Sequence, residues 1–372
     1  MGSGVTLGFN VACATLIDWQ ALVSWLESRQ LGTQVVFDPP EWTKPSNYSF
    51  RLSDVWQQQW TPNFDTTGLV RTLEFSDQSD DWQLDQEILV ALLVSPIAIQ
   101  FPSVAELQSS VRVRRYITQA SAKTALAFDT DAAERPLDAW AYDEALGFTI
   151  LPGVDLIEAL RKATQPEVTG DLYSFSCYRA TEYVILLGLA QELAVCNKPL
   201  YAKLQVQCEQ RVIRSGQFHE VFLREYGSQA EPVPSHYYIP GDRVWFRNPD
   251  EASSDVTGFE GSWVFYMGGG WFSNFWKRNR PFSIEDKALE IFHWRHGLVR
   301  NTEGEVCMDE VEVERRVAMT NANPNERHSV LQEMLQWRAA KGVYAGGCID
   351  TTRESPRWIC EGTADLILPN GE

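Results

Sequence analysis

The sequence predicts an α+β fold in which a buried helix carrying a cysteine packs on an antiparallel sheet. A helical pattern, TEYVILLGLAQELA, begins soon after Cys177 and is apolar on most sides, which is typical of a buried helix. Aromatic strands with turn residues at their ends follow within residues 238–250 and 261–276. A set of helices followed by a set of strands favours the α+β class.

The chain divides by composition into three predicted parts. Residues 1–80 form a Trp-rich N-terminal extension, residues 81–300 form the core, and residues 301–372 form a charged C-terminal extension. In the core, Ser103 and Glu106 form a predicted capping box at the start of a long helix. The other predicted elements are a helix near 17–30, a hairpin over 137–151, helices over 154–165 and 283–297, and one helix near the end of the charged segment 309–342.

The overall charge excludes some classes of partner. The chain has 372 residues and a formal net charge of -18, from 32 basic and 50 acidic side chains. A surface of this charge opposes binding to nucleic acid or to anionic membranes, because both need cationic side chains. No apolar run approaches the roughly 18 residues that cross a bilayer, so a cytoplasmic protein is predicted.

The cysteines and histidines give no metal-binding pattern. The seven cysteines are scattered and include no Cys-x-x-Cys pair, and the five histidines include no metal-binding spacing. We therefore predict no metal and no cofactor, and a reducing compartment. His293 and His296 are expected to be exposed on a helix.

Cys177 stands where a polar turn becomes a buried helix. The free N–H groups and the partial positive charge of a helix N-terminus favour a thiolate over a thiol. First-turn amides can also donate to a developing oxyanion. A cysteine in this place is either a nucleophile or a buried spacer, and helix mechanics alone leaves both interpretations open.

The order of several segments resembles one known family. The most specific segments are YSFSC, which ends at Cys177, and GDRVWFRNP, which runs from Gly241 to Pro249. They resemble the small, calcium-independent, spore-type bacterial protein-glutamine gamma-glutamyltransferases, whose fold is similar to papain-like and NlpC/P60 cysteine peptidases. The similarity is colinear from about Asp81 to about Arg300.

The resemblance implies a reaction and its partners. In this family a cysteine thiolate attacks the side-chain carboxamide of a protein or peptide glutamine, and ammonia leaves. A primary amine or water then takes the acyl group from the thioester. Cys177 falls on the nucleophile position.

Three positions depart from the family's site. Ser176 replaces an acidic residue, Ser262 replaces the glutamate that acts as base, and Asn274 replaces a histidine. Two residues could supply a base instead. Glu260 lies two residues before Ser262 and would share its face in an extended strand, and His236 precedes the Gly241 strand. For each, a purely structural role is an open alternative.

Aromatic side chains could line a narrow tunnel to the thiol. Such a tunnel would limit hydrolysis of the thioester by excluding water, although a packed aromatic core is the alternative. The predicted substrate-binding residues are Trp245, Phe259, Trp263, Trp271 and Asn274, with Phe272 and Trp276 as further candidates for the wall.

Three functions stay open at this point. The first is cysteine-dependent acyl transfer from glutamine to an amine. The second is hydrolysis by the same fold, as a glutamine deamidase or another cysteine hydrolase. The third is a non-catalytic binding or assembly protein that lost its base.

Overall fold

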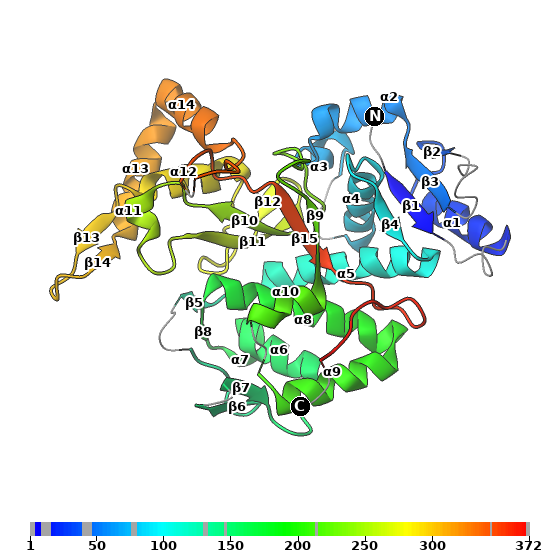
Figure 1. Cartoon of the computed structure of the whole chain (residues 1–372), viewed down its shortest axis with the longest axis horizontal. Helices are drawn as coiled ribbons and strands as arrows, with labels where there is room; N and C mark the ends of the chain where they lie inside the picture. The colour runs from blue at the N-terminus through cyan, green and yellow to red at the C-terminus, as the bar shows by residue number, and fades with distance from the viewer. Residues whose placement is uncertain are drawn as a thin grey trace.

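The computed structural model describes residues 4–8, 16–38, 47–75, 80–128, 133–144, 147–212, 215–342 and 344–369. Figure 1 shows a central sheet with two long helices beneath it, N-terminal elements on one side and a helical group on the other. The predicted α+β class is confirmed, because the central strands are antiparallel and the helices pack against them.

The central sheet has the strand order β12-β11-β10-β15-β9 among the described residues. Its neighbouring strands are all antiparallel. The strands are β9 (Leu223–Gly227), β10 (Arg243–Arg247), β11 (Gly261–Gly268), β12 (Trp271–Phe272) and β15 (Thr352–Pro356). The predicted strands near Gly241 and around the Gly268–Gly270 turn are confirmed. β15 comes from the predicted C-terminal extension, yet it lies inside the sheet.

Two long helices, α5 (Val104–Lys123) and α8 (Cys177–Cys196), lie against this sheet. They approach closely at Gly188, where a Cβ would come within 2.5 Å of Ile117 Cγ1. The middle of α8 is buried, as the apolar pattern predicts. The N-cap of α5 is also confirmed, since Ser103 Oγ accepts a hydrogen bond from Glu106 N at 3.1 Å.

The two faces of β10 and β11 serve different cores. Trp245 lies opposite Trp263 and Arg243 lies opposite Phe265, so these four side chains share one face. Phe265 belongs to the core around α8. The alternate residues, such as Phe246, face a second core that includes helix α12.

A four-stranded sheet forms the N-terminal part of the described chain, in the order β2-β3-β1-β4. Its pairing joins β1, in the predicted N-terminal extension, to β4, in the predicted core. The predicted boundaries near residues 80 and 300 remain predictions, and strand pairing crosses both. The elements are β1 (Val5–Gly8), α1 (Leu16–Ser28), β2 (Val35–Asp38), β3 (Asn47–Leu52), α2 (Asp54–Trp60), the 3-10 helix η1 (Pro62–Phe64), α3 (Leu69–Thr72), α4 (Asp81–Leu93) and β4 (Ile99–Phe101).

Shorter elements surround the other side of α8. The predicted hairpin near residues 137–151 is confirmed as β6 paired with β7. The elements are β5 (Ala127–Phe128), β6 (Trp140–Asp143), β7 (Gly147–Ile150), α6 (Leu156–Thr164), α7 (Pro166–Thr169), β8 (Ser174–Phe175), α9 (Lys198–Gln210) and α10 (Ser215–Phe222). Among the described residues, no helix has the length and apolar character needed to cross a membrane.

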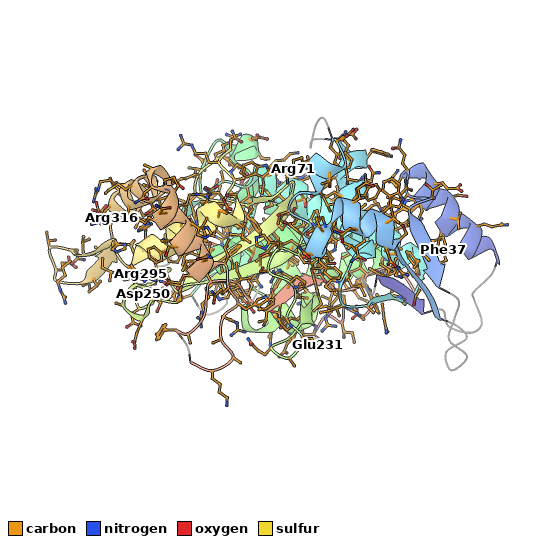
Figure 2. The ribbon with its side chains drawn as sticks, turned by 90° about the horizontal axis from the view of Figure 1, so that it is seen from above. Phe37, Arg71, Glu231, Asp250, Arg295 and Arg316 are labelled. Carbon is orange, nitrogen blue, oxygen red and sulfur yellow. The ribbon has the colours of Figure 1, made fainter. Side chains whose placement is uncertain are left out.

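A helical group forms the end opposite the N-terminal sheet. Its elements are α11 (Glu251–Ser254), α12 (Ile284–Trp294), β13 (Leu298–Arg300), β14 (Val306–Met308), α13 (Glu310–Ala322) and α14 (Pro324–Met334). The expectation that His293 is exposed is wrong, because it is 3% exposed and bonds to Thr320 at 2.9 Å. His296 is exposed, as expected. Desolvation of its ring is the largest effect that lowers its pKa, followed by the positive charges of Arg316 and Arg295. These two arginines lie at one end of the molecule in Figure 2.

Candidate active site

Cys177 is the first residue of α8, the buried helix that the sequence predicts. Ser176 caps the helix, and its Oγ accepts a hydrogen bond from Arg179 N at 3.3 Å. Just before it, β8 pairs in parallel with β5, and the Arg135 guanidinium lies 3.4 Å from the centre of the Phe175 ring. These contacts fix the backbone that leads into the cysteine.

Cys177 is part-exposed as a residue, and its thiol is strongly desolvated. Burial raises its pKa, whereas hydrogen bonds from the backbone N–H groups of Trp263 and Tyr178 and the charge of Arg243 lower it. Burial is the largest of these effects and the net pKa is raised. The helix N-terminus was predicted to favour the thiolate, and the net direction is the opposite because desolvation outweighs the donors.

Arg243 is the nearest cation to the thiol among the groups that shift its pKa, and it is only 1% exposed. Its guanidinium lies over the rings of Tyr178 and Trp263, 4.3 and 4.0 Å from their centres. Nε donates to Thr181 Oγ1 at 2.9 Å, which ties β10 to the first turns of α8. Among the described residues, its Nη2 has no hydrogen-bond partner.

Glu354, on β15, holds the guanidinium from the other side. Glu354 Oε2 accepts from Arg243 Nη1 at 2.9 Å, and Oε1 lies 2.9 Å from His219 Nδ1. The hydrogen bond to Glu354 raises the pKa of His219. A chain of polar contacts therefore runs from the part-exposed His219 through Glu354 and Arg243 to the surroundings of Cys177.

A protein-family model matches the part of the chain that contains most of these residues. The family model for protein-glutamine gamma-glutamyltransferases matches residues 69–341. The chain belongs to this family. The matched range contains Cys177 and Arg243, and it ends before Glu354.

Other comparisons add little to this assignment. A transglutaminase from Geobacillus stearothermophilus, solved without its C-terminal extension, is 16% identical. The alignment covers 57% of this chain and 98% of that chain, with a TM-score of 0.40. No curated protein matches the sequence.

Of the predicted substrate-binding aromatics, Trp263 lies at the thiol of this transglutaminase-family chain, and Trp245 packs against Trp263. The Trp245 and Trp263 rings are 4.9 Å apart, and Tyr178 meets Trp263 edge-on at 5.7 Å. Gly261 allows Trp245 to lie across the strand, because a Cβ there would be 2.4 Å from the indole. These rings form one wall around Cys177 and Arg243.

The other predicted aromatics for which ring packing is described lie in other surroundings, and the tunnel remains a prediction. Phe259 packs between Phe128 and Trp294, at 6.3 and 5.2 Å between ring centres. Trp271 is 40% exposed, and Phe272 is buried in the core of α12. The division follows from strand alternation and from the turn at the start of β11.

Asn274 has a turn role in the structure. Its Oδ1 accepts from the backbone N–H groups of Trp276 and Lys277, at 3.3 and 3.2 Å, and its Nδ2 donates to Arg280 O at 2.9 Å. These bonds use both acceptor positions of Oδ1 and one N–H of Nδ2 to shape the loop after β12. A substrate-binding role for Asn274 remains a prediction.

The two candidate bases differ in their distance from the chemistry. Glu260 is exposed, lies in the bend before β11, and is a charged neighbour of the Cys177 thiol. Within the described chain it makes no side-chain hydrogen bond to Cys177. His236 bonds to Ser235 Oγ at 3.1 Å, and its carbonyl accepts from Thr66 N. The structure thus brings Glu260 near the thiol, whereas His236 bonds to another region.

Sequence reasoning missed Arg243, Glu354 and His219. Arg243 stood in the quoted strand motif, and a charged residue at an inward position of an apolar strand was the available signal. For Glu354 and His219 no local signal exists, because their relation to Cys177 depends on how β15 inserts into the sheet.

Proposed function

We propose that this protein transfers the acyl group of a glutamine carboxamide to a primary amine through a thioester on Cys177. Family membership supports a transglutaminase-like function. The observation that carries the proposal is the part-exposed Cys177 at the start of α8, whose thiol receives two backbone N–H groups beside the Arg243 cation. These groups stabilise negative charge on sulfur at the moment of attack.

The proposed reaction proceeds in two halves. The Cys177 sulfur attacks the carboxamide carbon while its proton passes to a base, for which Glu260 is the candidate. The tetrahedral intermediate then collapses, the C–N bond breaks, and the protonated nitrogen leaves as ammonia. In the second half a primary amine attacks the thioester, loses a proton, and releases the sulfur as an amide forms.

The surroundings of the thiol define what each group would do. Arg243 is a positioning residue that favours the thiolate, because its charge lowers the thiol pKa against the effect of burial. Trp245 and Trp263 would contact the aliphatic part of the glutamine side chain. The proposed partners are a glutamine-bearing protein or peptide and a primary amine, in the cytoplasm. Spore-type character and calcium independence are part of the same proposal.

Trapping the acyl-enzyme tests this proposal directly. The protein would be incubated with a blocked Gln-Gly dipeptide, quenched in acid and digested with trypsin. Cys177 is the only cysteine of the tryptic segment 163–179, and this peptide should gain the acyl mass and lose it in hydroxylamine. Incorporation of monodansylcadaverine into a glutamine-bearing protein should accompany it. The absence of both acylation and amine incorporation, with calcium and without it, would contradict the proposal.

Two observations favour the alternatives, and the same assays separate them. Because Cys177 is part-exposed as a residue, water could take the acyl group from the thioester, as in a glutamine deamidase. Ammonia release without incorporation of the amine would identify that activity. The raised thiol pKa favours a non-catalytic binding protein instead, and it would be identified by the absence of both acylation and ammonia.

A further inference from the structure

A second pair of cysteines lies at the other end of α8. Cys196 is the last residue of the helix, and Cys360 follows β15 in the C-terminal segment. Each thiol is close enough to the other to shift its pKa. Cys360 Sγ also lies 3.6 Å from Ala105 O, and Cys196 Sγ lies 4.0 Å from Ser109 Oγ. Both sulfurs therefore meet against the start of α5.

The backbone around Cys360 is held firmly in this position. The buried Glu106 carboxylate accepts from Ile359 N and Cys360 N, at 2.8 and 3.0 Å, and from Thr363 Oγ1 at 2.8 Å. Asn197, next to Cys196, donates from Nδ2 to Ile359 O at 2.8 Å. The hydrogen bond from Asn197 to Ile359 thus joins the residues next to the two cysteines, so the fold itself holds the two cysteines close together.

We propose that Cys196 and Cys360 are a site of reversible disulfide formation that staples the C-terminal segment to α8. The oxidant is a low-molecular-weight disulfide of the glutathione class. The Cys196 thiolate attacks it, forming a mixed disulfide and releasing one thiolate. Cys360 sulfur then attacks Cys196 sulfur, the mixed disulfide breaks, and the second thiolate leaves. The two protein thiols give their protons to the two released thiolates.

The two cysteines have different parts in this sequence. Cys196 is part-exposed and Cys360 is 8% exposed, so an external disulfide reaches Cys196 first. The neighbouring Cys360 thiol lowers the pKa of Cys196, and Cys196 raises that of Cys360, which is consistent with Cys196 as the attacking group. Cys360 then resolves the mixed disulfide from inside.

Peptide mapping tests the proposal on the full chain. The reduced protein would be equilibrated with oxidised glutathione, blocked with iodoacetamide and digested with trypsin without reduction. Trypsin releases Cys196 on residues 180–203 and Cys360 on residues 358–372, each as a single-cysteine peptide. We expect the two peptides to appear joined, with the loss of two hydrogens, and to separate on reduction. Two separately alkylated peptides, or a glutathione adduct that persists on Cys196, would overturn the proposal.

Thermal unfolding tests the staple. Oxidation should raise the unfolding midpoint on the order of 5 °C, because a long loop is closed in the unfolded chain. Cys360→Ser should lose both the joined peptide and this rise, whereas Cys307→Ser, at a part-exposed cysteine on β14, should keep both. If Cys360→Ser does not fold, Cys196→Ser serves in its place. A joined peptide with no rise in the midpoint would refute the staple.

Discussion

Helix α8 carries a cysteine at each end, and the pKa values of the two thiols shift in opposite directions. At the N-terminus, Cys177 receives two backbone N–H groups and faces Arg243, yet burial raises its pKa. At the C-terminus, Cys196 lies where the helix dipole opposes a thiolate, yet the neighbouring Cys360 thiol lowers its pKa. Helix position therefore predicts the wrong order, and local desolvation and donors decide it.

This comparison separates the chemistry of the two ends. The N-terminal end is enclosed by Tyr178 and Trp263, and its charge partner comes from the sheet. The C-terminal end is open on the side of the exposed Val195 and meets a second thiol. We interpret the first end as a site for acyl chemistry and the second as a site for thiol exchange.

The largest expected effect separates the two cysteines by activity. Cys177→Ala should reduce amine incorporation by about a thousandfold or more, because loss of a nucleophile leaves only binding and positioning effects. Cys196→Ala, the matched variant at the other end of the same helix, should change the rate by less than about twofold. Equal losses in both variants, measured with monodansylcadaverine, would show that the ends do not differ in this way.

Removing the Arg243 cation should destabilise the whole protein. Arg243→Met leaves Glu354, whose side chain is 11% exposed, without its cation, and should destabilise the protein by about 3–5 kcal/mol. Urea denaturation measures this loss. Arg247→Met, two residues along β10 and part-exposed, is the control and should cost under about 1 kcal/mol. Recovery of stability in Arg243→Met/Glu354→Leu would assign the loss to the unpaired carboxylate.

A buried carboxylate tests whether burial outweighs donors elsewhere in the molecule. Glu87 accepts from Gly269 N at 2.8 Å, yet burial raises its pKa to about 7 from an ordinary value of 4.5. Between these values the folded state keeps a proton that the unfolded state loses, so stability falls as the pH rises through this window. The fall should be roughly 3 kcal/mol.

Glu87→Gln should remove this dependence, because the amide does not ionise. Urea denaturation at pH 4.5 and pH 8 measures the difference for each protein, and Glu74→Gln, at an exposed carboxylate, should behave as wild type. If the free energy of unfolding of Glu87→Gln changed with pH as much as that of the wild type, burial would not dominate the pKa of this carboxylate.

The smallest expected effect is the order of alkylation of the two cysteines. At pH 7, iodoacetamide should modify Cys196 faster than Cys177, since Cys196 has the lowered pKa and both are part-exposed. The rate at Cys177 should continue to rise into more alkaline solution than the rate at Cys196. Mass spectrometry of the tryptic segments containing each residue gives both profiles, and faster labelling of Cys177 would reverse the comparison.

The sequence predicted those parts of the fold that depend on local pattern. The buried helix after Cys177 and the strands containing Trp245 and Trp263 were predicted because apolar periodicity and turn residues are local signals. Of the candidate site, the cysteine and these two indoles share one place, since the motifs lie on neighbouring elements. The site roles of Glu260 and His236 remain predictions.

The rest depended on contacts distant in sequence. The capping box was half right, because Ser103 caps α5 while Glu106 binds the amides of Ile359 and Cys360. The local pattern predicted that the Glu106 carboxylate bonds to the N-terminus of its own helix, but it bonds to a segment distant in sequence instead. In the same way, no pattern near Arg243 indicates that Glu354 will lie beside it.

The position of β15 has a consequence for how the protein is made. A ribosome finishes β9, β10 and β11 long before it reaches Thr352, yet β15 pairs with both β9 and β10. Until β15 is made, the edges of β9 and β10 that pair with it are unpaired, and such edges can pair with other chains. We expect the last step in the folding of this sheet to follow the synthesis of β15, when this strand pairs with β9 and β10 and brings Glu354 to Arg243.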